Sequence, residues 1–279
     1  MTYERLKQYF DRINYRKGTE QTIQTLTLLQ IRHSLTFPFE NLNPFLDIPV
    51  LLDTDTLFSK MIVDHRGGYC YEHNLFFLSV LKKMKFDSRG LSGRVLESGR
   101  EQPRRTHMLI ITTLNEKPYI SDVGFGSAAP CMPLLLDTDI VHQTPFGQYC
   151  FIYEGDGYIL ESGFNGKWRP LYYFDLQEQF HEDFEVGNWF TSTNVKAKFK
   201  NDLMVSIKTE KCRYTLDNTT LTSYKRDGNK ETMVLVSKEE IRAVLNNIFK
   251  LKLNNLPGLD IKLQELLERN IQPHNSGKV

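Results

Sequence analysis

Residues 66–83 begin Arg66-Gly67-Gly68-Tyr69-Cys70-Tyr71-Glu72-His73-Asn74 and continue Leu-Phe-Phe-Leu-Ser-Val-Leu-Lys-Lys. The apolar run predicts a helix that begins near Cys70 and ends at the two lysines, whose charges favour a helix C-terminus. Unpaired N–H groups and partial positive charge in the first turn of a helix favour a thiolate over a thiol. We also expect the two glycines before Cys70 to let another group approach its sulfur closely.

The residues before this motif have the pattern of further helices. Residues 22–33 place leucines and isoleucines on one broad apolar face, and residues 54–63 repeat the pattern over a shorter length. We therefore expect residues 1–86 to form a helical bundle that carries the cysteine.

After the motif the hydrophobic period changes from that of a helix to that of a strand. Runs rich in β-forming residues occur at 107–112, 119–123, 148–153, 158–161 and 168–174. Gly155-Asp156-Gly157 and Asn165-Gly166 predict hairpin turns between them. Residues 87–198 are thus expected to form an antiparallel sheet or barrel.

The last part of the chain combines both periods. Alternating runs at 203–208 and 232–236 precede a helix start at Ser237, so residues 199–279 are expected to mix strands and helices. The final segment, 273–279, is polar and contains Gly and Pro, which predicts little independent order.

A histidine and an aspartate flank the first predicted hairpin. If this hairpin is symmetric about Leu114-Asn115, His107 lies directly opposite Asp122. Opposed residues have Cβ atoms about 4.5–5.5 Å apart, close enough for the carboxylate to accept the imidazole N–H. The sequence then offers Cys70 as a nucleophile, His107 as a base and Asp122 as the group that orients the base.

Composition limits the partners of this chain. Thirty-five basic and 34 acidic residues leave a formal charge of +1, which provides no general attraction for nucleic acid or an anionic membrane. The start has no apolar core of a signal peptide, and no run of about 18 apolar residues occurs. The four cysteines have no paired C-x-x-C spacing, which favours free thiols in a reducing compartment. We expect a cytoplasmic protein.

Plainer interpretations of these residues stay open. A lone cysteine is more often a small buried hydrophobe, which we favour for Cys131, Cys150 and Cys212. Alone, the histidine is a satisfied strand residue and the aspartate an edge charge. Cys70 and His73 form a C-x-x-H pair, but zinc needs three or four ligands and no matching second pair occurs, so no metal is predicted.

Three segments resemble the arylamine N-acetyltransferase family. Residues 66–74 are similar to the signature around the active cysteine of that family, which has Arg-Gly-Gly, an aromatic residue, Cys and then Asn four residues on. Pro38-Phe39-Glu40-Asn41-Leu42 and Asp122-Val123-Gly124-Phe125-Gly126 match in the same order. The resemblance extends from about residue 5 to residue 195.

The resemblance implies both a fold and a reaction. The fold is α+β: a helical bundle over residues 1–86, an antiparallel β-barrel over 87–198 and an α/β lid over 199–279, around a core like that of cysteine proteases and transglutaminases. In the reaction, acetyl-coenzyme A acetylates Cys70, and an arylamine, hydrazine or arylhydroxylamine then removes the acetyl group in a ping-pong mechanism. The family implies no metal, and a monomer or a homodimer.

The family also implies roles for individual residues. Cys70 corresponds to the nucleophile, His107 to the acid and base, and Asp122 to the orienting residue. The acceptor-pocket walls would be Phe39, Val95 and Phe125, and the candidates for coenzyme A are Arg104, Arg105, Thr106 and Gly126. A plainer alternative for the three pocket-wall residues is core packing. For the two arginines it is a solvated surface.

Two more features of the resemblance concern the surroundings of the site. Glu40 and Arg66 resemble a structural ion pair, with a surface pair of small energetic value as the alternative. The segment 188–193 continues with Asn194-Val195 where many members have His-Pro. This departure concerns loop contacts.

Two other functions compete with acetyl transfer. The same Cys-His-Asp order serves hydrolases and transglutaminase-like enzymes. Alternatively, the chain is a binding module in which the barrel holds a small ligand and Cys70 is inert. Turnover of a thioester with an arylamine acceptor would distinguish acetyl transfer from hydrolysis. Slow alkylation of Cys70 would favour the binding module.

Overall fold

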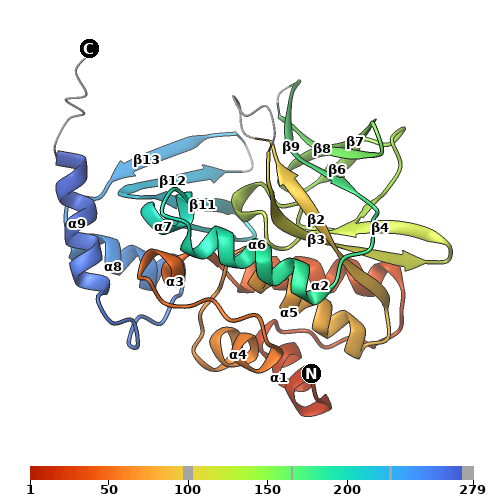
Figure 1. Ribbon diagram of the computed structural model, residues 1–279, viewed down its shortest axis with the longest axis horizontal. Coiled ribbons are helices and arrows are strands. Elements are labelled where there is room, and N and C mark those ends of the chain that lie inside the picture. The colour runs from red at the N-terminus through yellow and green to blue at the C-terminus, as the bar shows by residue number, and fades with distance from the viewer. Residues whose placement is uncertain (97–102, 165, 226–227, 272–279) are drawn as a thin grey trace.

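The structure is a computed structural model that describes residues 1–96, 103–164, 166–225 and 228–271 (Figure 1). The chain has the predicted α+β fold, with N-terminal helices, a nearly closed antiparallel barrel and a C-terminal α/β lid. Within the described residues, no helix is long and apolar enough to cross a membrane.

Short helices make up the N-terminal part, and polar side chains cap several of them. They are α1 (Tyr3–Arg12), α2 (Ile23–Thr36), α3 (Leu42–Phe45), α4 (Thr54–Phe58), a π-helical turn η1 (Ser59–Val63) and α5 (Cys70–Lys83). Thr22 accepts the Thr25 N–H and so caps α2, which confirms the helix predicted over residues 22–33. The stretch 54–63 is helical as predicted, but it divides into α4 and η1.

Eight strands form the barrel. They are β2 (Asp87–Val95), β3 (Arg105–Leu114), β4 (Lys117–Ser121), β5 (Leu134–Leu135), β6 (His142–Thr144), β7 (Gly147–Glu154), β8 (Gly157–Phe164) and β9 (Lys167–Asp175), in the order β5-β4-β3-β2-β9-β8-β7-β6. The two edge strands are linked by a hydrogen bond of 2.9 Å from His142 Nε2 to Leu135 O. The edges therefore meet, which leaves the barrel nearly closed.

The β7–β8 hairpin confirms one of the two predicted Gly-containing turns. Glu154 pairs with Gly157 around the turn at Gly155-Asp156. Asn165 of the other predicted Gly-containing turn lies outside the described residues, as does the terminal segment 273–279.

The predicted symmetry of the β3–β4 hairpin about Leu114-Asn115 is wrong. The turn residues are Asn115 and Glu116, both with positive φ (50° and 64°), and Leu114 pairs with Lys117. A two-residue turn with both φ angles positive matches the twist of the strands, which fixes this register. The ladder ends where Ile110 pairs with Ser121, so Asp122 lies just beyond β4 and does not face His107 across the ladder.

A second sheet forms the lid. It has the order β1-β10-β11-β12-β13, with β1 (Phe39–Glu40), β10 (Met204–Lys208), β11 (Cys212–Asp217), β12 (Thr220–Lys225) and β13 (Lys230–Val234), and it is accompanied by α8 (Lys238–Asn247) and α9 (Leu259–Ile271). Ser237 caps α8 by accepting the Glu240 N–H, as predicted. Because β1 comes from the N-terminal part, the segments joined by the sheet are far apart in sequence. The boundaries at residues 86 and 198 stay a prediction.

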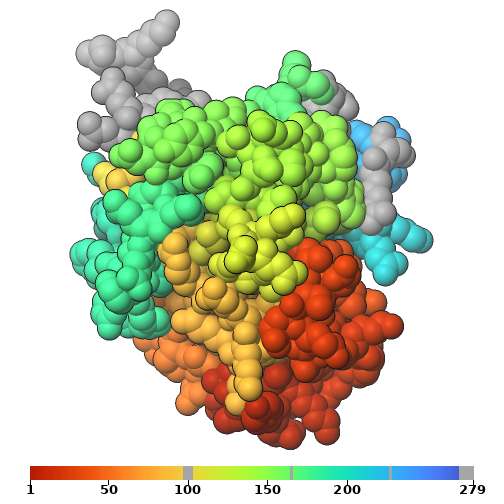
Figure 2. All heavy atoms as spheres, turned by 90° about the vertical axis from the view of Figure 1, so that its right-hand side faces the viewer, coloured from red at the N-terminus to blue at the C-terminus, as the bar shows by residue number. Residues whose placement is uncertain are grey.

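Two further helices connect the barrel with the lid. They are α6 (His181–Thr193) and α7 (Lys198–Asn201), and Figure 1 shows α6 running across the molecule between the barrel and the lid. The sequence did not indicate α6, because apolar residues lie on both of its faces: Phe184 is buried, whereas Val186 and Trp189 are exposed. On the face in Figure 2, the barrel strands (green) sit on the N-terminal helices (red to orange).

Candidate active site

Cys70 is the first residue of α5, as predicted, and its side chain is buried. The Tyr69 N–H, one residue before the helix, donates to the Glu72 carboxylate at 3.1 Å. A carboxylate within the first turn satisfies an otherwise unpaired donor and suits the positive end of the helix. Glu72 therefore fixes the point at which the helix begins and, with it, the position of the sulfur.

The glycines before Cys70 do not serve the expected purpose. A Cβ atom on Gly67 would lie 1.8 Å from Pro38 O, and one on Gly68 would lie 2.7 Å from Glu72 Cβ. These glycines thus admit the Pro38 backbone and the Glu72 side chain, whereas we expected them to open access to the sulfur. Close approach to Cys70 is provided by Gly124, where a Cβ would lie 2.7 Å from Cys70 Cα.

A buried charge network lies beneath the start of α5. Arg66 donates to Glu40 at 2.7 and 2.9 Å, and Lys60 bonds to Glu72 at 2.6 Å. Although burial raises it, the charges of Arg66 and Lys60 and the Leu42 N–H lower the pKa of Glu40 to about 2. The alternative of an exposed Glu40–Arg66 pair is wrong, because both residues are buried.

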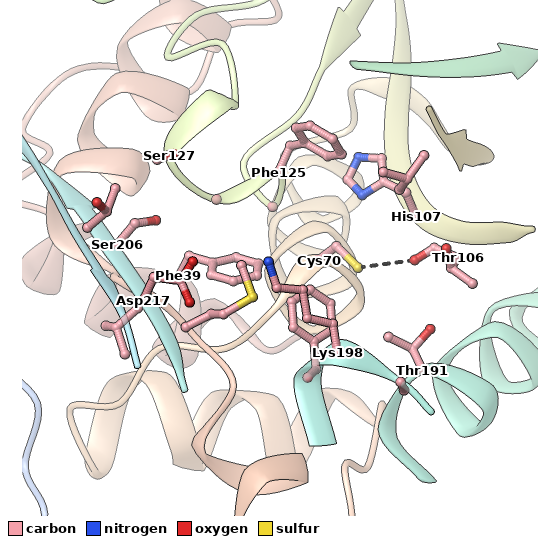
Figure 3. Close-up of a pocket in the computed structure, with 18 of the residues that line it drawn as sticks. Phe39, Cys70, Thr106, His107, Phe125, Ser127, Thr191, Lys198, Ser206 and Asp217 are labelled. Carbon is pink, nitrogen blue, oxygen red and sulfur yellow. Dashed lines mark hydrogen bonds between the residues drawn. The ribbon is translucent and has the colours of Figure 1, made fainter. Parts of the chain in front are cut away.

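His107 and Asp122 are in contact despite the shifted hairpin register. His107 Nε2 lies 2.8 Å from Asp122 Oδ2, and both side chains are buried. The ring meets the carboxylate because Asp122 lies in the loop after β4 and turns back toward β3. Within the described residues, His107 Nδ1 has no hydrogen-bond partner, and Figure 3 shows His107 on the same side of the pocket as Cys70.

Asn74 holds the other side of the aspartate and was not selected as a site residue from the sequence. Its Nδ2 donates to Asp122 Oδ1 at 3.1 Å and to Met108 O at 2.7 Å, while its Oδ1 accepts the Val123 N–H. The signal was present, since Asn74 lies one helical turn after Cys70 in the quoted motif. Asn74 ties the loop after β4 and strand β3 to the helix that carries the thiol.

The charge state of Asp122 follows from these contacts. Burial raises the pKa of its carboxyl group, but the attraction of His107 and hydrogen bonds from His107, Gly124 and Asn74 outweigh that effect and lower the pKa below its ordinary value. Asp122 is therefore a buried carboxylate with its acceptor oxygens satisfied.

The thiol of Cys70 is in a different electrostatic environment from the one expected. Burial raises its pKa and the negative charge of Asp122 raises it further, although backbone donors of Met108 and Tyr71 act in the opposite direction. The sulfur lies 3.7 Å from Thr106 O, to which the neutral thiol can donate. Burial therefore outweighs the helix-start effect, and forming a thiolate requires a nearby acceptor for the proton.

One pocket of about 780 Å³ opens onto Cys70 and His107 (Figure 3). Phe39, Val95 and Phe125, the proposed acceptor walls, line it, as do Arg104, Thr106 and Gly126. Arg105 does not line the pocket, because its guanidinium pairs with Asp175 at 2.5 Å. Asp122 lies behind His107 and is likewise absent from the lining.

The lid and its linker supply pocket residues that the sequence did not indicate. They include Phe190, Lys196, Lys198, Phe199, Met204, Ser206, Asp217 and Tyr224. Figure 3 shows Lys198 reaching into the pocket from α7, with Ser206 and Asp217 at the end away from Thr106. Asn194, at the departure noted above, lines the pocket together with Lys196 and Lys198, which follow it in the chain.

Aromatic rings define the wall behind the histidine. The Phe125 ring lies 4.8 Å from the His107 ring and 4.9 Å from the Tyr172 ring, centroid to centroid, and Tyr172 is also 4.8 Å from His107. Tyr172, on β9, was not selected from the sequence. This packing restricts the orientation of the imidazole, in addition to its hydrogen bond with Asp122.

The possible metal pair of Cys70 and His73 is occupied by other contacts. His73 Nε2 lies 3.1 Å from Pro38 O, and its Nδ1 lies 3.0 Å from His33 Nε2. Among the described residues, no group of three or more His, Cys, Asp or Glu side chains could hold a metal ion. His73 thus acts as a buried hydrogen-bonding residue.

Cys70 and His107 line the same pocket, and His107 is hydrogen-bonded to Asp122; enzymes with a cysteine nucleophile combine these three residue types. The sequence profile of a family described as N-acetyltransferase matches residues 22–257. The arylamine N-acetyltransferase of Escherichia coli is 35% identical over 254 residues, which cover 88% of each chain. The chain belongs to the arylamine N-acetyltransferase family.

Two further relatives bear on the reaction. The arylamine N-acetyltransferase / N-hydroxyarylamine O-acetyltransferase of Salmonella typhimurium is 34% identical over 218 residues, covering 78% of this chain and 75% of that protein. The structure of Mycobacterium marinum arylamine N-acetyltransferase in complex with coenzyme A superposes with a TM-score of 0.90 at 31% identity. That superposition covers 94% of this chain and 99% of the relative.

Proposed function

We propose that this protein transfers the acetyl group of acetyl-coenzyme A to the nitrogen of arylamines or hydrazines, or to arylhydroxylamines, through an acetyl-Cys70 intermediate. The observation that carries the proposal is the buried Cys70 on a pocket wall shared with His107, whose ring is bonded to Asp122 at 2.8 Å. Membership of the family and the coenzyme A complex of the Mycobacterium marinum relative support it.

In the first half-reaction, His107 takes the proton of Cys70 as the sulfur attacks the thioester carbonyl. A bond forms between Cys70 Sγ and the acetyl carbon, and the bond from that carbon to the sulfur of coenzyme A breaks. The departing thiolate receives the proton from His107. Because burial raises the pKa of Cys70, the proton transfer to His107 is essential, and the Asp122 carboxylate stabilises the imidazolium that results.

In the second half-reaction, the acceptor nitrogen attacks the acetyl carbon on Cys70. The new C–N bond forms, the C–S bond breaks, and His107 accepts the proton that the nitrogen loses and returns it to the Cys70 sulfur. An aromatic amine has low basicity, so it reaches the site uncharged and needs no prior deprotonation. Phe39, Val95 and Phe125 would hold its ring.

Cationic side chains at the pocket suit the phosphates of coenzyme A. Arg104, Lys196 and Lys198 line the pocket and supply positive charge there, and the uncharged Thr106 and Gly126 line it as well. Arg105 is not part of this proposal, since its guanidinium is engaged by Asp175. No Gly-rich phosphate-binding motif is required for such contacts.

A product assay tests the proposed reaction against the hydrolase alternative. Purified protein is incubated with acetyl-coenzyme A and an arylamine, and N-acetylated amine, free coenzyme A and acetate are quantified separately. The proposal predicts amide formation in step with coenzyme A release. Acetate formation that is unaffected by the amine would support a hydrolase, and no coenzyme A release would favour the binding module.

A further inference from the structure

The loop that carries Phe125 has its backbone held by side chains from other elements. It follows β4 and includes the 3₁₀ turn η2 (Gly126–Ala128), and its carbonyls have few strand partners. Buried carbonyls must be paired with some donor, so each partner can be identified. Gln30 of α2 donates to Pro130 O at 3.0 Å, which fixes the far end of the loop.

Three successive carbonyls of η2 receive donors from three different strands. Lys208 Nζ of β10 donates to Gly126 O at 3.3 Å, Arg213 of β11 to Ser127 O at 3.2 Å, and Tyr149 OH of β7 to Ala128 O at 3.0 Å. Two of these donors are cations from the lid, and the third belongs to the barrel. The lid and the barrel therefore both hold this turn through hydrogen bonds to its carbonyls.

Lys208 is the unusual member of this group. It is buried, and among the residues that the structure describes no carboxylate lies within ion-pair distance of its ammonium. Burial lowers its pKa to about 8, although Cys131 and Asp122 act to raise it. A buried ammonium with a single carbonyl contact does little for stability, because its desolvation cost is not repaid by an ion pair.

The position of Gly126 connects Lys208 with the pocket. Gly126 has a left-handed φ of 59°, and a Cβ there would lie 3.6 Å from the Phe39 ring, so the turn packs against one pocket wall. The preceding residue, Phe125, is the wall that contacts His107. Movement of this turn therefore displaces both rings at once.

We propose that Lys208 is a positioning residue that, with Arg213 and Tyr149, pins the turn Gly126–Ala128 and so sets the acceptor-binding wall of the pocket. This role rests on the proposed acetyl transfer for its effect on the acceptor. The effect of Lys208 on the backbone mobility of the loop can be measured separately, without any turnover.

Hydrogen–deuterium exchange of Lys208→Met tests the pinning. Methionine is similar in size and cannot donate, and Gly126 O keeps the Ala129 N–H at 3.3 Å, so the variant retains a folded loop. We expect faster exchange over residues 123–129, unchanged exchange in α5, and a thermal midpoint that is not lowered. Lys211→Met, an exposed lysine next to β11, is the matched control with unchanged exchange. Unchanged exchange over 123–129 in Lys208→Met contradicts the proposal.

Steady-state and half-reaction kinetics test the consequence for the acceptor. Loss of one charge-assisted hydrogen bond predicts a rise of about tenfold in KM for the arylamine. Acetylation of Cys70 by a small ester such as p-nitrophenyl acetate is expected to fall much less than acceptor affinity, because Asp122 still holds His107. Lys208→Arg, which keeps a charged donor, is expected to restore much of the acceptor affinity. Equal loss of both half-reactions, or no rescue by arginine, would contradict a positioning role.

Two other variants keep the inference testable if Lys208→Met does not fold. Arg213→Met and Tyr149→Phe each remove one donor to the same turn, and each is expected to increase exchange over residues 123–129 and KM for the arylamine. If both leave the exchange unchanged, the pinning is wrong. If exchange rises while the wild-type protein transfers no acetyl group, the proposed function fails and the pinning stands.

Discussion

At the scale of single residues, the sequence predicted which side chains meet but not how they meet. His107 and Asp122 are bonded at 2.8 Å, yet through a loop beyond the ladder and not as a directly opposed pair. The residue types were enough to predict that an aspartate pairs with a nearby histidine. The path of the backbone depends instead on the geometry of the turn at Asn115 and Glu116. Asn74 completes the contact by holding the second carboxylate oxygen.

Asp122→Asn is expected to abolish most of the activity while leaving the fold intact. The carboxamide retains the shape, but it presents an N–H group either to His107 or to the donors Asn74 and Gly124, and the imidazole loses the partner that sets its tautomer. The expected loss in kcat is on the order of 10³-fold or more.

The pH dependence of Cys70 alkylation by iodoacetamide measures this effect independently of turnover. The variant is expected to lose the histidine-dependent reactivity of the thiol, with an unchanged circular dichroism spectrum as the control for folding. A wild-type alkylation profile in Asp122→Asn would count against the role of the pair.

At the scale of elements, the start of α5 was predictable and its surroundings were not. The motif placed Cys70 at the helix start because the apolar run and the two lysines delimit the helix. The sequence could not indicate that Gly67 faces Pro38 O, or that His73 continues a chain of hydrogen bonds to His33 and Tyr9, since these contacts join segments far apart in the chain.

Acid is expected to destabilise the protein through this buried chain. Because Pro38 O can only accept, His73 Nε2 donates to it. Burial keeps both rings neutral, so His73 Nδ1 accepts from His33 Nε2. Burial lowers the pKa of His73 from 6.5 to about 4, and that of His33 well below its ordinary value. Folded-state values below the unfolded ones mean that stability is fully present above pH 6.5 and is lost as the pH falls toward 4.

Urea unfolding at pH 7 and pH 5 measures this loss. The lowered pKa of His73 corresponds to a loss of at most about 3 kcal/mol in the free energy of unfolding over its whole titration. Roughly half of that loss is expected between pH 7 and pH 5. His73→Gln, which can still donate to Pro38 O, should show a smaller pH dependence than the wild-type protein. Equal stability at both pH values in the wild type would be inconsistent with buried neutral histidines.

At the scale of the whole molecule, the pocket is formed by all three parts of the chain. Cys70 comes from the helices, His107 from the barrel, and Lys198, Met204 and Asp217 from the linker and the lid. The family resemblance gave the fold class, and local patterns gave the barrel strands. The pocket residues from the lid could not be inferred, because the pairing of β1 with β10 joins residues more than one hundred positions apart.

Lys196→Ala/Lys198→Ala is expected to weaken acetyl-coenzyme A binding specifically. If these two pocket cations contact the phosphates as proposed, their loss predicts a rise of about tenfold or more in KM for acetyl-coenzyme A. KM for p-nitrophenyl acetate, which has no phosphate, is expected to stay the same. Lys200→Ala is the matched control, since Lys200 lies on the same helix α7 but bonds to Asp47 outside the pocket. An equal effect on both donors would argue against a phosphate contact.

The central claim is that the acetyl group passes through Cys70, and intact-mass spectrometry tests it most directly. The protein is mixed with acetyl-coenzyme A, its mass is recorded, an arylamine is added, and the modified residue is located by peptide mapping, with Cys70→Ala as the control. The account predicts a single acetyl group on Cys70 that the amine removes as N-acetylated product, and no adduct in the variant. An unmodified Cys70 while N-acetylated amine accumulates would contradict the account.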